Sequence, residues 1–423
     1  MKPILKIWKN FTILKSKKQI FLDSLIFVFL TLAFFTIPTF SSQTFLNYIT
    51  WGFTAIFVLL VIASFILYYS FKLDTISLFL FLFCFSALIS SLLNGMQGFS
   101  FTPFLLTFLT ILIYSYCKSN KSVVSLLILG IYFSLICFGI LFFITYWDAL
   151  SQLNFDRLGG SFGDENDIAI FFGLGSLISC YFIFYSKNLW NKIISVLILC
   201  FFVLLGISTG SKIFIMVIVF IPLALIILFF GKKRWWISLL VIISLFCAIV
   251  LVLSLPFAET IKNRLLTFIN TFFNSLSSGQ NSTDLSSIQR FYMFFDGIEM
   301  FFRKPLFGFG INGFEFFGGL NQGWSHNHFS ESLADYGLIG SILFNYGIPV
   351  GIIGFLKKKE SKLIIHYLII LFFIILMFSV ALFTQKIYAF VIGISLSELT
   401  DDKTFFEFPI FGKHNRRRNE INE

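Results

Sequence analysis

Two histidines, His326 and His328, stand two positions apart in a chain that contains only four. Glu331 follows closely, so this short segment offers two imidazoles and a carboxylate. Such a set can hold a catalytic zinc ion. Alternatively, a histidine can accept a proton from a hydroxyl group without a cofactor, because it titrates near neutrality. We favour His326 as a general base and His328 as a residue that caps the following span.

Arg290 lies in a segment, residues 288–302, whose side chains sort into two faces when they are placed about 100° apart. Polar and charged residues share one face and mostly phenylalanines occupy the other, which predicts an amphipathic helix in the membrane interface. Arg290 projects from the aromatic flank, away from the acids. It either extends toward lipid headgroups or contacts a phosphate group of a ligand.

Two earlier segments carry further charged residues. Arg157 precedes an acidic cluster at residues 164–167, Asp-Glu-Asn-Asp. These acids either begin a helix, where the helix dipole favours them, or form a loose carboxylate pair for a divalent cation. Lys212 follows a Ser-Thr-Gly-Ser turn and begins an apolar run. A charge in that place is either an interface anchor or a contact for an anionic substrate group.

A glycine pattern, GxGxxG, runs from Gly308 through Gly310 to Gly313. A dinucleotide-binding site would place this pattern after a strand and at the start of a helix. Here it follows the interfacial segment and Pro305, so we reject that interpretation. Turns that need positive φ, or a close approach of the backbone, explain the glycines better.

The composition places these residues in a membrane. The chain has 423 residues, of which 57% are hydrophobic and 12% charged, and it contains 63 phenylalanines. Soluble proteins are about 25% charged, so a water-facing fold could not bury this apolar surplus. The six cysteines all fall in apolar runs without CxxC spacing and behave as small apolar side chains.

Apolar runs long enough to cross a bilayer predict about twelve transmembrane helices. They lie near residues 20–37, 48–69, 76–93, 101–117, 123–146, 168–185, 193–207, 213–230, 235–255, 329–355, 363–383 and 387–396. The chain therefore divides into nine spans within residues 1–255, a long external loop at 256–328, three spans within 329–396 and a basic tail at 397–423. Most of the 31 Lys and Arg residues then fall on one side, which predicts that both termini are cytoplasmic.

The order of the motifs resembles the O-antigen polymerase and O-antigen ligase superfamily of bacterial polysaccharide assembly. Arg157 with its Asp- and Asn-rich turn comes first, then the Thr-Gly-Ser turn that ends at Lys212, then a long late loop. That loop and the span after it contain, in order, Arg290, Lys304-Pro305-Leu-Phe-Gly308-Phe-Gly310, Ser325-His326-Asn327, Glu331 and Tyr336-Gly337-Leu-Ile-Gly340.

The resemblance implies an all-α integral membrane protein, similar in fold to C-type glycosyltransferases, that needs neither metal nor cofactor. Its substrate would be a glycan on undecaprenyl diphosphate at the outer face of the bacterial cytoplasmic membrane. His326 would deprotonate the acceptor hydroxyl, while Arg290 and Arg157, with Lys212, would hold the diphosphate. The residues that would support the site are Asn327, His328, Glu331, Gly308 and Gly310.

Two departures from the family pattern bear on function. The basic residue of the Thr-Gly-Ser turn is commonly arginine in the family, whereas here it is Lys212, which presents a point charge. Ligases often carry a further histidine where this chain has Trp324, which favours a polymerase of O-antigen or capsular repeat units. The alternatives are a ligase that transfers finished polymer to the lipid A core, and a flippase for the lipid-linked unit. Expected partners are the lipid-linked glycan, membrane lipids, a chain-length regulator and a flippase, but no nucleic acid.

Overall fold

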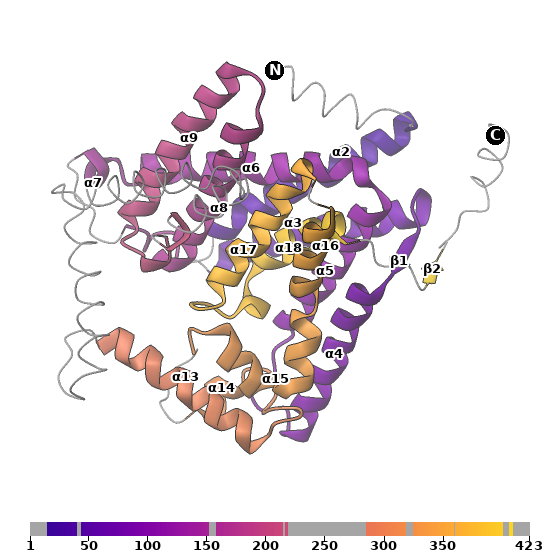
Figure 1. Ribbon diagram of the computed structural model, residues 1–423, viewed down its shortest axis with the longest axis vertical. Helices are drawn as coiled ribbons and strands as arrows, with labels where there is room; N and C mark the ends of the chain where they lie inside the picture. Colours follow the sequence, from indigo (N-terminus) through magenta and orange to yellow (C-terminus); the bar gives the residue numbers. More distant parts are fainter. Residues whose placement is uncertain are drawn as a thin grey trace.

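The computed structural model describes residues 15–39, 44–151, 158–214, 216–218, 285–318, 325–358, 360–400 and 406–408. Most of these residues are helical (Figure 1). Within this part of the chain, seven helices are long and apolar enough to cross a membrane. The expectation of an all-α integral membrane protein is therefore confirmed.

The first seven predicted spans correspond to helices of similar length. These are α2 (Lys17–Thr39), α3 (Thr44–Leu67), α4 (Thr75–Leu93), α5 (Thr102–Ser119), α6 (Lys121–Thr145), α8 (Glu165–Tyr185) and α9 (Leu189–Ser208), with the short α7 (Trp147–Ser151) between α6 and α8. Polar caps fix several of their starts: Asp74 accepts a hydrogen bond from the Ser77 N–H at the start of α4, as N-cap residues do. The eighth and ninth predicted spans, 213–230 and 235–255, lie almost entirely outside the described residues.

The later part of the chain is more broken than its hydropathy indicates. It contains α13 (Leu285–Arg303), α14 (Gly313–Phe317), α15 (His328–Asn345), α16 (Gly347–Lys358), η3 (Ser361–Leu363), α17 (Ile364–Leu376), η4 (Leu382–Thr384) and α18 (Lys386–Leu399). Two short strands, β1 (Phe71–Leu73) and β2 (Phe406–Phe408), pair antiparallel.

Two predicted spans differ from the helices observed. Residues 329–355 do not form one regular helix, because α15 is kinked at Gly337 and gives way to α16 after Asn345. Residues 363–383 form a helix only as far as Leu376. Beyond it the backbone turns to His328, where the Met377 carbonyl accepts from the His328 N–H at 2.8 Å.

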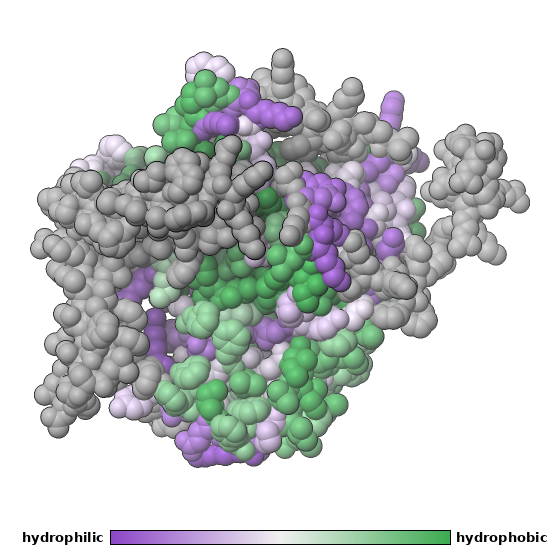
Figure 2. Space-filling model, viewed as in Figure 1, coloured by the Kyte–Doolittle hydropathy of each residue, from purple (hydrophilic) through white to green (hydrophobic). Residues whose placement is uncertain are grey.

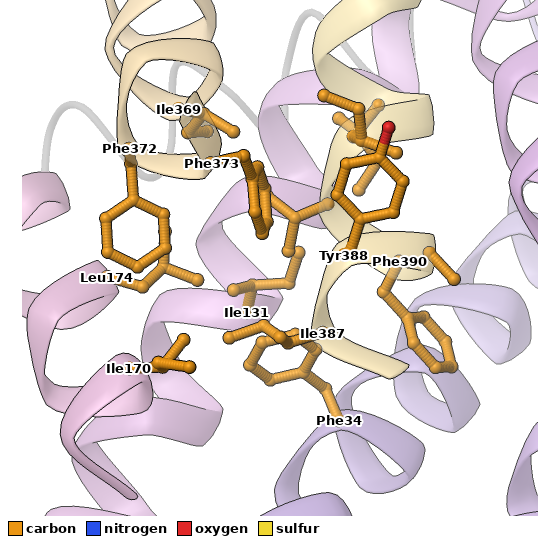
Figure 3. Close-up of a cluster of buried hydrophobic side chains, with 14 of the residues drawn as sticks. Phe34, Ile131, Ile170, Leu174, Ile369, Phe372, Phe373, Ile387, Tyr388 and Phe390 are labelled. Atoms are coloured by element: carbon orange, nitrogen blue, oxygen red, sulfur yellow. The ribbon is translucent and has the colours of Figure 1, made fainter. Parts of the chain in front are cut away.

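Aromatic and aliphatic side chains fill the centre of the bundle, among them residues of α2, α6, α8, α17 and α18 (Figure 3). Phe34 of α2 packs edge-on against Phe390 of α18, with ring centroids 6.2 Å apart. Phe373 of α17 meets Tyr388 of α18 at 5.0 Å. Helices in lipid gain little from burying apolar surface against each other, so close packing of this kind supplies much of their association.

Helix α4 links two polar regions at opposite ends of the bundle. At its start, buried Asp74 pairs with Lys118, 3.5 Å away, and nearby Asp23 pairs with Lys15 at 2.8 Å. Just after its end, the Asn94 side chain donates to the Gly308 carbonyl at 3.1 Å. Between these ends, hydrophobic residues cover the middle of the visible surface, and hydrophilic ones gather at the lower edge near the end of α13 (Figure 2).

Candidate active site

The site is built around the kink in α15. Gly337 has φ 63° and ψ −166°, a conformation that interrupts the helix. A turn at residues 305–310 pairs with the backbone groups around the kink. Its carbonyls at Pro305 and Leu306 accept from the N–H groups of residues 338 and 339, at 2.8 and 3.2 Å. A broken helix at membrane depth is tolerated only where other protein groups satisfy its backbone in this way.

The same turn also satisfies carbonyls on the other side of the kink. The Phe309 and Gly310 N–H groups donate to the carbonyls of Ala334 and Asp335, at 2.9 and 2.8 Å. Gly308 and Gly310 have φ of 68° and 93°. A Cβ on Gly308 would lie 2.5 Å from the Asp335 carbonyl oxygen. Positive φ and the close approach of the Asp335 backbone to Gly308 account for these glycines.

Helix α13 packs against the first half of α15. Gly297 permits the closest approach, since a Cβ there would lie 2.9 Å from the Ser330 Cβ. Met293 and Met300 flank it and are buried with Ala334 of α15. The turn at 305–310 follows α13 directly and also contacts α15. Together, the turn and this packing position the backbone of Arg290 relative to the segment that begins α15.

His326 lies in the short segment before α15. It has φ 54°, a left-handed conformation that is uncommon for a residue other than glycine. Asn327 begins the helix, and its side chain accepts from the N–H groups of Phe329 and Ser330 at 3.0 and 3.2 Å. The Ser325 hydroxyl accepts from the Asn327 N–H at 3.1 Å. His326 is thus held between two fixed neighbours.

The electrostatic surroundings of His326 suit a general base. Partial burial and the positive charge of Arg290 lower the pKa of His326, while the negative charge of Asp164 opposes this shift. The neutral imidazole, which is the form that can accept a proton, is therefore favoured at neutral pH. Among the described residues, no hydrogen bond to the His326 ring is found.

Asp164 connects this group to a second segment of the predicted site. It caps α8 by accepting from the Asn166 N–H at 2.7 Å, so the acidic cluster begins a helix, one of the two roles considered for it. The Asn166 side chain in turn accepts from the Ser211 hydroxyl at 2.8 Å. The turn before Lys212 is therefore joined to the start of α8, and half-buried Lys212 directly follows it. Arg157 lies outside the described residues.

His328 has a different environment from His326. Its ring is buried, and its Nδ1 accepts from the Leu382 N–H at 3.1 Å. Nε2 must then carry the proton and donates to the Asn345 side chain, 3.0 Å away. Nδ1 thus connects α15 with the segment after α17, and Nε2 connects the two parts of α15 on either side of Gly337.

The zinc hypothesis finds no support in this geometry. His328 has both nitrogens occupied, and the Glu331 Oε2 atom accepts from Ser325. Among the described residues, no group of three or more His, Cys, Asp or Glu side chains could hold a metal ion.

Two residues of this region were not singled out from the sequence as members of the site. Ser325 links the His326 segment to Glu331. Asp335 is buried, and its Oδ1 accepts from the Phe314 N–H at 2.7 Å, which fixes the start of α14. The sequence did contain a signal for Asp335. Glu331 and Asp335 stand four positions apart at the start of an apolar span, where ionisable residues are rare and usually functional.

A comparison with protein-family models adds an independent finding. The model described as O-antigen ligase matches residues 198–345. The match confirms the resemblance to the O-antigen polymerase and ligase superfamily. The matched region contains Lys212, Arg290, His326 and the kink at Gly337. No curated protein matches the chain.

The superfamily match has clear functional implications. It implies a glycosyltransferase-like enzyme with polymerase or ligase activity and a lipid-linked glycan as the kind of substrate. It gives no support to the flippase alternative. Together with the apolar helices, it indicates a multi-pass membrane protein.

Proposed function

We propose that the protein is a polymerase that joins undecaprenyl-diphosphate-linked repeat units of an O-antigen or capsular polysaccharide. The observation that carries the proposal is that the half-buried His326 lies within electrostatic range of Arg290 and Asp164, so that both charges act on the pKa of the imidazole. The proposed transfer requires two groups. One is a base that takes up the proton of the acceptor hydroxyl, and the other is a positive charge that stabilises the departing diphosphate.

In the proposed reaction, the acceptor sugar hydroxyl attacks the anomeric carbon of the donor glycan. The bond from that carbon to the lipid diphosphate breaks, and the bonding electrons leave with the diphosphate. His326 takes the proton of the attacking hydroxyl. Arg290, together with Arg157 and Lys212, stabilises the negative charge that develops on the diphosphate, as guanidinium groups do in sites from which water is partly excluded.

We place this site at the outer face of the cytoplasmic membrane, in a chain of twelve spans with both termini inside. The distribution of lysines supports this orientation. Lys15, Lys118 and Lys121 lie at the end of the bundle opposite the His326 segment, where Lys15 contacts Asn120 and Lys118 contacts Thr400. Short cytoplasmic loops carry the excess of such residues.

The direct test uses purified protein with one lipid-linked repeat unit as its sole substrate. A polymerase produces a ladder of longer lipid-linked glycans, with or without EDTA. A ligase leaves this substrate unchanged and transfers glycan only when lipid A core is added. A transporter moves the substrate across vesicles without lengthening it, and either of these last two results would refute the proposal.

Replacing Arg290 with alanine is expected to lower kcat/KM for the lipid donor by about 10- to 100-fold, because a charge-assisted contact is lost. Loss of this positive charge also raises the pKa of His326, whereas Asp164, the other charge acting on the ring, remains. The acid limb of the pH–rate profile should therefore move to higher pH. Initial rates measured across pH test both effects.

The matched control for this prediction is Arg303→Ala on the same helix. Arg303 is exposed and pairs with Glu299, one turn away. Exposed pairs of this kind contribute little, so this variant should keep both the wild-type rate and the wild-type pH profile. Equal effects of the two substitutions would show that Arg290 acts only as a surface charge.

A further inference from the structure

The left-handed conformation of His326 needs an explanation in the surrounding structure. Residues other than glycine held in this region carry local strain and persist only where neighbouring contacts enforce them. His326 itself contributes no such contact through its ring among the described residues. The contacts found among the described residues act on the residues on either side of it.

Glu331 supplies these contacts through Ser325. Its Oε2 atom accepts from both the N–H and the hydroxyl of Ser325, at 3.0 and 2.8 Å. The Ser325 hydroxyl lies 2.8 Å from the Asn327 carbonyl as well, and it accepts from the Asn327 N–H. Ser325 and Glu331 are both buried. The carboxylate thus fixes the residue before His326 and, through it, the residue after.

A buried carboxylate is costly unless hydrogen bonds compensate it. Those bonds go to the backbone and side chain of Ser325, one position before His326, and not to the imidazole. Glu331 is therefore placed to control where the His326 ring lies without taking part in the proton transfer.

We propose that Glu331 is a positioning residue that, through Ser325, holds His326 in the geometry required for proton transfer. The proposal rests on the proposed role of His326 as a general base. Glutamate and glutamine should differ little in this role, because an amide oxygen also accepts from the Ser325 N–H and hydroxyl. Alanine offers no acceptor and lets residues 325–327 relax.

The kinetic test compares Glu331→Ala and Glu331→Gln in the full-length protein. We expect the alanine variant to lose about 100-fold in kcat, as small misplacements of a reacting group do, with KM for the lipid donor unchanged because Arg290 is intact. Glu331→Gln should recover most of the rate. A glutamine variant as slow as the alanine variant would show that the charge or a proton of Glu331 is needed, and would overturn the proposal.

A second measurement does not depend on enzyme activity. Diethyl pyrocarbonate modifies neutral imidazoles, and mass spectrometry reports the modification of His326 as a function of pH. In Glu331→Ala the ring should become more exposed, and its titration midpoint should rise toward the ordinary value for histidine as it moves away from Arg290. Glu331→Gln, and Glu299→Ala on the exposed side of α13 as control, should titrate like the wild type.

The two measurements separate the possible failures. An unchanged His326 titration in Glu331→Ala would refute the positioning role whatever the enzyme does. A shifted titration combined with full polymer synthesis by a His326 variant would instead refute the base assignment and leave the positioning intact. A melting temperature for each variant identifies any that has simply unfolded.

Discussion

Replacement of His326 by alanine is expected to lower the turnover rate by about 100- to 10,000-fold, the usual contribution of a general base. Protein yield and donor binding should be unchanged, since the ring is half-buried and Arg290 remains in place. Single-turnover rates with saturating lipid donor measure this effect directly. A His326 variant that keeps the wild-type rate would contradict the role of His326 as the base.

The pH dependence follows from the same assignment. The base is active when neutral, so the rate rises as pH increases through the pKa of His326 and then levels off. Because burial and Arg290 lower that pKa, the plateau should begin at a lower pH than for an ordinary histidine. The remaining activity of the alanine variant should lack this limb.

His328→Ala is the matched control, two positions away. It removes the ring that joins Asn345 to Leu382 and leaves buried groups without partners. Each unsatisfied buried group costs about 1–3 kcal/mol, so the variant should melt earlier in detergent. The fraction that remains folded should keep the pH profile of the wild type.

Replacement of Gly337 by alanine should have the largest effect on the folded state. Its combination of φ 63° and ψ −166° belongs to a region that is essentially restricted to glycine. A Cβ there would also lie 2.5 Å from the carbonyl carbon and oxygen of Leu306. Backbone strain alone costs about 1–3 kcal/mol, and the clash adds to it. The expected result is a large fall in melting temperature and loss of activity.

Gly52→Ala provides the comparison for this substitution. Gly52 lies within α3, and a Cβ there would have no neighbour within 4 Å. Alanine should be neutral or slightly stabilising at this position, because it loses less backbone freedom on folding. Detergent-solubilised variants can be compared by melting temperature and by the monodisperse fraction. A Gly337 variant that melts like the Gly52 variant would show that the kink does not hold the site together.

Hydropathy was sufficient to predict the first seven helices. Each is a long apolar run, and a bilayer requires such a run to be helical because every backbone group must be satisfied internally. Residues 328–358 are also long and apolar enough to cross a membrane, but hydropathy did not reveal the break at Gly337. The backbone N–H and C=O groups that are freed at Gly337 form hydrogen bonds with the turn at 305–310 instead. Hydropathy depends only on neighbouring residues, so it cannot indicate a partner that lies so far away along the chain.

The residue types of the site could be predicted, but not their arrangement. Scarcity of charge in an apolar chain identified His326 and Arg290. Their proximity depends on Gly297 packing against Ser330, which no periodic pattern in the sequence indicates. Asp164 was predicted only as a helix start or cation ligand, because its electrostatic effect on the pKa of His326 acts between segments that are far apart in the chain.

The kink in α15 also determines how the bilayer is connected to the candidate site. The helix is interrupted at Gly337. Residues before the kink form hydrogen bonds with the turn at 305–310 and pack against α13. Membrane-spanning helices tilt when bilayer thickness changes. Residues 338–345 are joined to the His326 segment by two routes, the turn at 305–310 and the hydrogen bond between Asn345 and His328. We therefore expect a change in membrane thickness to reach the candidate site through these two connections.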